Sequence, residues 1–376
     1  MKKTNRVAVI GMGLVSPQGT GIDEVLQNKP CLPSFRSSSE IFGKEGLKSG
    51  YNKVTDSFAN AYLPSISMQY TDGITRYAGI ASSMAIGKYL PYNSINPSEV
   101  GMALGTSLGS IVSISGFDLQ SLNEGPSSVR PMEFPNTVSN APTSKVGIWF
   151  KLKGPSVTIS NGFTSSTDAM GFAFEEISCG RVGYYLAGGS EEISDNVYHG
   201  YTSSLADKRV SPSKIALAGG SSVVETVVEG SGMLLLCSMG EAKSKGLETY
   251  GEITDFVSIK LSTDRQYVET VLDIITTMIG NSDFPEEDIM LYSSYLPFNE
   301  FACTVYAEVI RCFGKERLIT HNSLDGVSAN YLGLSGVFNA ACALEDLAHS
   351  KSGSRGALVF DIGCDGKFSG IFIKKI

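Results

Sequence analysis

Apolar positions along the chain follow two periods, and strand-like runs alternate with helix-like runs. RVAVIGMGLVSP (6–17) is a nearly continuous apolar run, which predicts a buried strand followed by a turn. Between residues 165 and 179 the apolar positions recur at helical spacing, as Met170, Ala173, Phe174 and Ile177. Gly180 marks the end of this predicted helix. VGYYLAGGSEE (182–192) then predicts a strand that ends in a glycine turn.

The second half of the chain shows the same rhythm. Strands that alternate with helices in both halves indicate an α/β fold built by duplication. No low-complexity linker separates the halves, which we place at residues 1–245 and 246–376. The later segments are predicted as strands at DIMLYSSY (288–295), LITHNSL (318–324), GALVFDIG (356–363) and FSGIFIKKI (368–376), and as helices at 300–313 and 332–349.

Charge and composition exclude several classes of protein. The net charge is −8, so neither nucleic acid nor an anionic membrane is an expected partner. The seven cysteines are dispersed without zinc-binding spacing, which predicts reduced thiols and no metal site. The N-terminal apolar run is short, contains two glycines and lacks a cleavage site, and no run reaches the ~18–20 residues of a membrane span. We therefore expect a soluble cytoplasmic protein.

Gly11-Met12-Gly13 is similar to the start of a dinucleotide-binding fingerprint. Ser16 stands where the third glycine belongs, and Pro17 and Gly19 prevent a helix from beginning at the position that the motif requires. The sequence therefore argues against nucleotide binding.

The segment SNGFTSSTDAMG (160–171) has the layout of a strand-to-helix turn that presents one side chain. Thr164, Ser165 and Ser166 offer N-caps, and Asp168 falls in the first helical turn. Phe163 lies at the tip, where a reactive residue would be expected. Uncharged stretches rich in glycine, serine and threonine, such as 101–117, suit close backbone packing or a buried subunit interface.

Several segments together resemble the β-ketoacyl synthase family of the thiolase superfamily. They occur in family order along nearly the whole chain: VAVIGMGLVSPQG, GTSLGS, PNTVSNAP, LKGPSVTIS, LAGGSEE, VVEGSGMLLL and DIGCDG. The resemblance implies the thiolase fold, a duplicated five-layer αβαβα arrangement that is used as a dimer.

The catalytic positions of the family are not retained. Where the family has its nucleophilic cysteine this chain has Phe163, and where it has two histidines this chain has Tyr292, in YSSYLP, and Asn330, in ANYLGLSG. The family lysine position is Asp325, and an aromatic residue of the glycine turn is replaced by Cys364. Condensation needs a nucleophile, assistance to decarboxylation and oxyanion donors. The resemblance therefore implies an inactive member with no catalytic residues at these positions.

An inactive member of this family resembles the chain length factors of type II polyketide synthases, including systems that make aryl polyenes. The resemblance implies a heterodimer with an active β-ketoacyl synthase, a shared acyl tunnel, and no cofactor of its own. The acyl chain would arrive on the phosphopantetheine of an acyl carrier protein. Because this chain is acidic, and Lys208-Arg209 is its only notable basic pair away from the termini, we expect the carrier to dock mainly on the partner. Leu108, Met132, Glu133, Phe134 and Thr137 resemble the interface and tunnel region, with ordinary interface packing as the simpler interpretation.

Two other functions remain open. One is an acyltransferase or condensing enzyme that uses Ser160, Thr164 or Ser165 with a base such as His321. The other is a homodimeric acyl-binding scaffold. Cys179 is interpreted as a small buried residue near a C-cap, and His199 and His349 as surface residues.

Overall fold

A computed structural model gives the coordinates of the protein. It describes residues 5–27, 48–54, 59–63, 70–89, 94–205, 224–261, 265–294, 300–320, 323–324, 327–349, 353–363 and 365–376.

Five strands of the N-terminal half form one side of a large mixed sheet. The three outermost strands are parallel, the fourth is antiparallel to both of its neighbours, and the first strand of the chain lies at the centre of the sheet. In order across the sheet they are β5 (Ser156–Ile159), β4 (Val100–Gly105), β6 (Tyr184–Glu191), β8 (Gly230–Ser238) and β1 (Val7–Ser16).

The C-terminal half repeats this arrangement strand by strand. Its five strands have the same order from the outer edge to the centre and the same parallel and antiparallel relations. The two halves meet where the first strand of each half pairs antiparallel with the other. The duplication predicted from the alternating pattern is confirmed, whereas the boundary at residues 245 and 246 stays a prediction. From edge to centre the strands are β11 (Leu318–Ile319), β10 (Ile289–Tyr292), β14 (Gly356–Ile362), β15 (Lys367–Lys374) and β9 (Gly251–Lys260).

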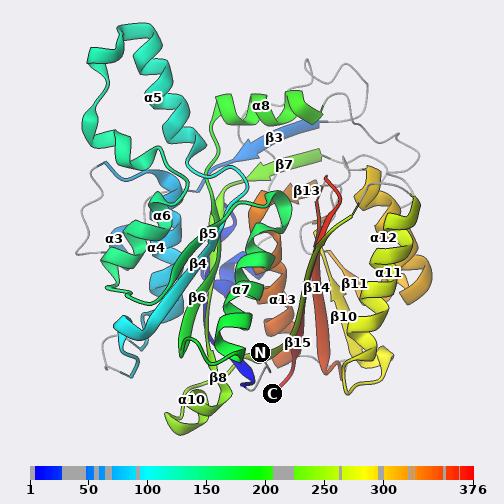
Figure 1. Ribbon diagram of the computed structural model, residues 1–376. Helices are drawn as coiled ribbons and strands as arrows, with labels where there is room; N and C mark the ends of the chain where they lie inside the picture. The colour runs from blue at the N-terminus through cyan, green and yellow to red at the C-terminus, as the bar shows by residue number, and fades with distance from the viewer. Residues whose placement is uncertain are drawn as a thin grey trace.

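Helices form three layers around the two halves of the sheet, which confirms the αβαβα expectation. One pair lies between the halves, and a further pair covers each outer face (Figure 1). The central helices bury small and apolar side chains on both sides, among them Ala173, Val337 and Ala340, so that both half-sheets can approach them closely. The central pair is α7 (Ser165–Ser178) and α13 (Ser335–His349), and the outer pairs are α4 (Gly73–Ile86) with α6 (Ala141–Trp149) and α11 (Arg265–Gly280) with α12 (Glu300–Phe313).

The first glycines of the chain lie inside β1 rather than in a nucleotide-binding turn. Gly11 packs directly on α4, because a Cβ atom built there would lie 2.0 Å from the carbonyl oxygen of Ala85. A side chain at this position would push the helix off the sheet. The glycine is therefore explained by close packing of strand against helix.

A second, smaller sheet lies over the ends of the central helices, close to helix α8 (Asp195–Leu205) (Figure 1). LITHNSL was predicted as one strand, and this prediction is wrong. Its first two residues form β11 in the large sheet, and its last two form a strand of the small sheet, so the chain changes sheets within the segment. The strands of the small sheet are, in order, β12 (Ser323–Leu324), β13 (Val327–Asn330), β7 (Val224–Val228) and β3 (Lys48–Asn52).

One helical segment of the N-terminal half projects away from the layers. It consists of α5 (Ile111–Glu124) and two short 3-10 helices, η3 (Pro126–Ser128) and η4 (Pro131–Asn136), and we call it the arm (Figure 1). Among the described residues, no helix is both long enough and apolar enough to cross a membrane. The remaining short elements are β2 (Gly19–Thr20), α1 (Ile22–Gln27), α3 (Ala59–Tyr62), η2 (Pro97–Glu99), α10 (Met239–Ser244), η7 (Glu286–Asp288) and η8 (Lys315–Arg317).

Candidate functional site

The turn that carries Phe163 joins β5 to the central helix α7. It contains a single-turn 3-10 helix, η5 (Gly162–Thr164), in which Gly162 has φ +68°. Phe163 is half-buried and packs against two apolar clusters, one in the C-terminal half and one that includes Tyr51 and Leu332. An apolar ring therefore occupies the tip of the turn between β5 and α7.

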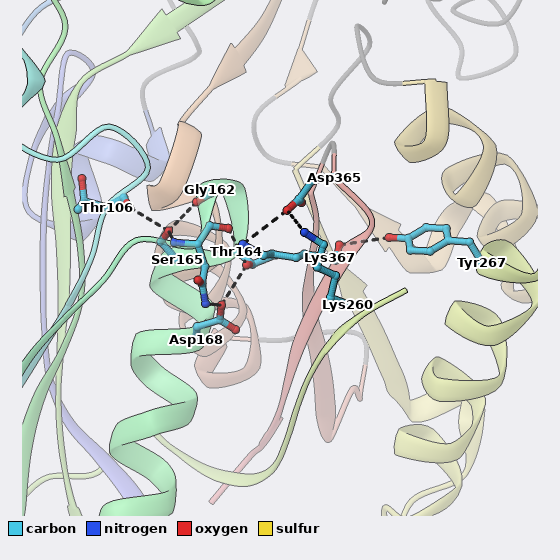
Figure 2. A network of polar contacts seen from close by, with 10 residues as sticks. Thr106, Gly162, Thr164, Ser165, Asp168, Lys260, Tyr267, Asp365 and Lys367 are labelled. Carbon is cyan, nitrogen blue, oxygen red and sulfur yellow. Dashed lines mark hydrogen bonds and ion pairs between the residues drawn. The ribbon is translucent and has the colours of Figure 1, made fainter. Parts of the chain in front are cut away.

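Polar side chains hold this turn in place (Figure 2). The Asn161 N–H donates to Ser165 Oγ at 2.9 Å, and its side-chain amide donates to Asp168 Oδ2 at 2.8 Å. The predicted capping residues act differently from expectation. Thr164 occupies the N-cap position but makes no capping bond to a backbone N–H, and its hydroxyl donates to Asp168 Oδ2 at 3.0 Å. The first turn of α7 is thus fixed through Asp168.

The hydroxyl groups beside Phe163 are poorly placed to replace a nucleophile. Ser165 is fully buried, and its oxygen lies 2.6 Å from the Gly162 carbonyl and 3.0 Å from the Thr106 carbonyl, both acceptors. Thr164 is also fully buried, whereas Ser160 is exposed. A serine or threonine nucleophile needs an adjacent base and access to substrate.

The histidines of the described residues do not reach this turn. His199 is exposed on α8 beside the ring of Tyr198, and His349 is exposed at the end of α13, where it contacts Glu345. Both agree with the surface positions predicted for them. His321, Asp325 and Cys364, which were singled out in the sequence, lie outside the described residues. Cys179 is the C-cap of α7, which confirms its predicted place near a C-cap, but it is only partly buried, because the chain turns at Gly180 and leaves the thiol at the edge of the helix.

A second short turn, from the C-terminal half, lies against the first. It is the 3-10 helix η9 (Leu332–Leu334), which precedes α13 just as η5 precedes α7. Asn330 is buried at the end of β13, and its Oδ1 accepts the Leu332 N–H at 2.9 Å. Asn330 therefore lies next to the two turns η5 and η9, which together form the site.

Tyr292 is not brought to this site. It is buried at the end of β10, and its hydroxyl donates to Asp346 Oδ2 at 2.8 Å. Asp346 lies 11 residues beyond the start of α13, roughly 16 Å along the helix. Burial, followed by the charge of Asp346, raises the pKa of the Tyr292 hydroxyl far above its usual value. This hydroxyl therefore remains protonated and acts as a hydrogen-bond donor within the core.

Glu191 lies between the turn after β4 and η9. It is wholly buried at the end of β6, and its carboxylate accepts the N–H groups of Ser107 and Leu108 and the hydroxyl of Thr106. The backbone of Gly333, from the other half, lies beside the same carboxylate and favours its charged form. Burial raises the pKa of Glu191 to about 7, although these donors act in the opposite direction.

Glu191 and Leu332 were not predicted as site residues. The signal for Glu191 is present in LAGGSEE, where a carboxylate closes an otherwise apolar buried strand. Leu332 gives no such signal, because its importance lies in a backbone angle that the residue type does not reveal.

The predicted tunnel and interface residues separate into two groups. Leu108 packs against the same apolar cluster as Phe163. The other four lie on or beside η4: Met132 and Phe134 are exposed, Glu133 pairs with Arg130 at 3.2 Å, and the Thr137 hydroxyl donates to the Phe134 carbonyl. Phe134 also contacts Phe117 of α5, with 5.9 Å between ring centroids. The arm is thus an ordered surface with apolar side chains on its outside.

The glycine turn after β14 forms the far side of the site. Asp365 lies between two lysines, 3.4 Å from Lys260 Nζ and 3.5 Å from Lys367 Nζ (Figure 2). The Tyr267 hydroxyl donates to the Lys367 carbonyl, which links this turn to α11. Ion pairs thus hold this turn on the C-terminal side of Phe163. Among the described residues no group of three or more histidine, cysteine or acidic side chains could hold a metal ion.

Stability is expected to fall as pH rises toward neutrality because of two buried carboxyls. Burial raises the pKa of both Glu191 and Asp361 to about 7. Between about pH 4.5 and 7 the unfolded chain loses protons that the folded chain keeps, so the free energy of unfolding decreases by up to about 1.4 kcal/mol per pH unit for each group. Denaturant melts at pH 5 and 8 would measure this decrease. Glu191→Gln should show a smaller decrease than the wild type, and equal decreases would contradict the assignment.

Comparison with known proteins identifies the relatives of this chain. The family model described as "Beta-ketoacyl synthase, N-terminal domain" matches residues 4–242. The 3-oxoacyl-[acyl-carrier-protein] synthase 2 of Vibrio cholerae is 24% identical over 257 residues, which cover 67% of this chain and 62% of that protein. The match thus spans less than two thirds of this relative.

Solved structures share the fold over nearly the whole chain. One, described as "The ishigamide ketosynthase/chain length factor", has a TM-score of 0.81 at 15% identity and covers 99% of this chain and all of its own. Another, a type II PKS acyl-carrier protein in complex with its ketosynthase bound to the hexaketide, has a TM-score of 0.75 at 19% identity with the same coverage. At these identities the likeness establishes the fold.

Proposed function

The chain belongs to the β-ketoacyl synthase family, and we propose that it is a non-catalytic member that pairs with an active β-ketoacyl synthase and shapes the channel for its growing acyl chain. The observation that carries this proposal is Phe163 at the tip of the turn between β5 and α7. A phenylalanine cannot form the thioester on which condensation depends. The role is that of a chain length factor in type II polyketide synthesis.

The surroundings of Phe163 support the proposal. Thr164 and Ser165 are buried and already hydrogen-bonded, and Tyr292 bonds Asp346 instead of facing the turn. An acyltransferase with a replaced nucleophile would need an accessible hydroxyl and a base beside it. The geometry of the described residues therefore favours the non-catalytic role over the acyltransferase.

A surface suited to a partner chain lies on the outer side of the N-terminal half. Within the described part of the sheet, β5 pairs with β4 alone, so its other edge is available to a second chain. Ile148 at the end of α6 is 75% exposed, and Met132 and Phe134 of the arm are 64% and 60% exposed. Exposed apolar side chains beside a sheet edge are typical of a subunit interface. We propose that the partner synthase binds here and that an acyl carrier protein delivers substrate on its phosphopantetheine, mainly through the partner.

Co-expression tests the proposal. The tagged chain would be purified from cells that also produce an active β-ketoacyl synthase encoded beside it, and the intact masses would be measured. We expect an equimolar second chain with an active-site cysteine, condensation by the pair, and no detectable condensation by this chain alone. Purification as a homodimer without a partner would refute the heterodimer and favour an acyl-binding scaffold. Condensation by the chain alone would refute the non-catalytic role.

A further inference from the structure

Leu332 has a left-handed backbone conformation that leucine rarely adopts. Its φ is +49°, and among the described residues only two other non-glycine residues, Tyr70 and Lys151, have positive φ. Both of these are exposed, whereas Leu332 is 1% exposed. The conformation costs a leucine free energy that a glycine would not lose. Such a residue persists only where its surroundings hold it, and strain of this kind clusters at functional sites.

Contacts from both halves of the molecule hold Leu332. Its N–H donates to the buried Asn330 Oδ1 at 2.9 Å, and its carbonyl accepts the Ser335 hydroxyl at 3.0 Å. The next residue, Gly333, packs against Glu191, because a Cβ atom built on Gly333 would lie 2.6 Å from Glu191 Oε1. Asn330 therefore fixes the strained residue from its own half, and Glu191 fixes the adjacent backbone from the other half.

The side chain held in this way packs into a small apolar cluster. Leu332 belongs to a buried apolar cluster with Tyr51, Ile193 and Tyr198, and both Phe163 and Leu108 pack against that cluster. Leu108 is anchored by the same carboxylate, because its N–H also donates to Glu191. Three apolar side chains, Leu108, Phe163 and Leu332, thus converge on one small cluster from three separate turns. We call them the plug.

We infer that Asn330 is a positioning residue that holds Leu332 in its left-handed conformation, and that the plug thereby excludes an acyl chain from the site beneath the Phe163 turn of this chain. The inference rests on the proposed function, because sealing this site would leave the partner's site as the only end of the channel. The inference also makes a claim of its own. Asn330, at the position of a family catalytic histidine, supports the turn η9, which carries Leu332 of the plug. Without the Asn330 acceptor, Leu332 would relax toward ordinary backbone angles and the plug would loosen.

Two pairs of variants test the strain at Leu332. Leu332→Gly and Leu332→Ala both remove the side chain, but glycine adopts positive φ freely and alanine does not. We expect Leu332→Gly to melt about 2 °C or more above Leu332→Ala. Leu334→Gly and Leu334→Ala form the matched control, because Leu334 lies in the same 3-10 helix, is fully buried and has no positive φ. There alanine should be the more stable. The same order at both positions would overturn the inference.

Binding of a fluorescent polyene fatty acid, cis-parinaric acid, tests the closure. We expect little binding by the wild type and at least 10-fold tighter binding by Phe163→Ala/Leu332→Gly. Asn330→Ala should bind at least threefold more tightly than the wild type, and Asn330→Asp, which keeps an oxygen acceptor for the Leu332 N–H, should match the wild type. Ile376→Ala, at an exposed position, is the control.

Failure of this inference and failure of the proposed function give different results. If the double variant is folded by circular dichroism but binds the probe no better than the wild type, the plug does not close an acyl site. Equal binding by Asn330→Ala and Asn330→Asp would overturn the positioning role. Neither result depends on a partner, whereas the heterodimer is decided by co-purification alone.

Discussion

Ile148→Asp is expected to weaken association with the partner synthase at least about 100-fold while leaving the fold of the chain intact. Ile148 is 75% exposed at the end of α6, so the substitution disturbs few contacts within the chain. At the proposed interface the same aspartate would be buried without a partner charge, which costs several kcal/mol, and each ~1.4 kcal/mol is a tenfold change in the dissociation constant. Analytical ultracentrifugation or interferometry with the purified partner would measure the change.

Ile376→Asp provides a matched control for this experiment. Ile376 is also an exposed isoleucine, at 58%, but it lies at the C-terminus, away from α6 and the arm (Figure 1). We expect its dissociation constant to remain within about twofold of the wild type, in line with the small effects of most surface substitutions. An unchanged affinity in Ile148→Asp would place the interface elsewhere and remove the structural support for the arm as part of it.

The order of strands and helices could be predicted because it follows from local patterns. The apolar stripe of α7 and the strand runs on either side of it depend on near neighbours in the sequence, and the structure has them where expected. The duplication also follows from this alternation. The division of LITHNSL between two sheets does not, because the choice between pairing with β10 and pairing with β13 is made by strands distant in the sequence.

The sequence predicted which positions belong to the site, but not the contacts that their side chains make. The layout of the turn identified Phe163 and the family resemblance identified Asn330, and both lie at the junction of the two halves. The same reasoning identified Tyr292, yet its hydroxyl is directed to Asp346, an acceptor supplied by the far end of α13. The Leu332 N–H is held by Asn330, and the adjacent Gly333 packs against Glu191, which comes from the other half. Contacts between distant segments decided each of these cases.

Buried hydrogen bonds tie the two halves together at their junction. The Val337 N–H, at the start of α13, donates to Ser166 Oγ of α7 at 3.2 Å, and the Thr167 hydroxyl donates to Asp361 Oδ2 at 2.5 Å. These are buried polar contacts, and leaving one of their donors or acceptors unpaired costs about 1–3 kcal/mol. The junction fixes α7 and α13, and with them the turns η5 and η9 that precede these helices.

Gly336→Ala is expected to be the most destabilising small substitution at this junction, lowering the free energy of unfolding by roughly 3 kcal/mol or more. A Cβ atom built on Gly336 would lie 1.7 Å from Thr167 Oγ1 and 2.6 Å from Asp361 Oδ2, so α7 and α13 would have to separate. Denaturant unfolding would measure the loss. Gly116→Ala is the matched control, because Gly116 lies within α5 with no atom within 4 Å of a Cβ built there. That substitution should raise stability by roughly 0.5–1 kcal/mol.

A double-mutant cycle identifies the cause of the loss. Thr167→Ala removes the oxygen nearest to the new methyl group, although it also removes the hydrogen bond to Asp361. If the clash is the cause, Gly336→Ala combined with Thr167→Ala should cost at least about 1 kcal/mol less than the sum of the two single substitutions. Additive costs would show that the methyl group does not meet Thr167 and that the two helices are farther apart than described. If the two helices are farther apart, η9 is less tightly packed, because it directly precedes the first turn of α13. The packing that holds Leu332 in its left-handed conformation would then be weaker.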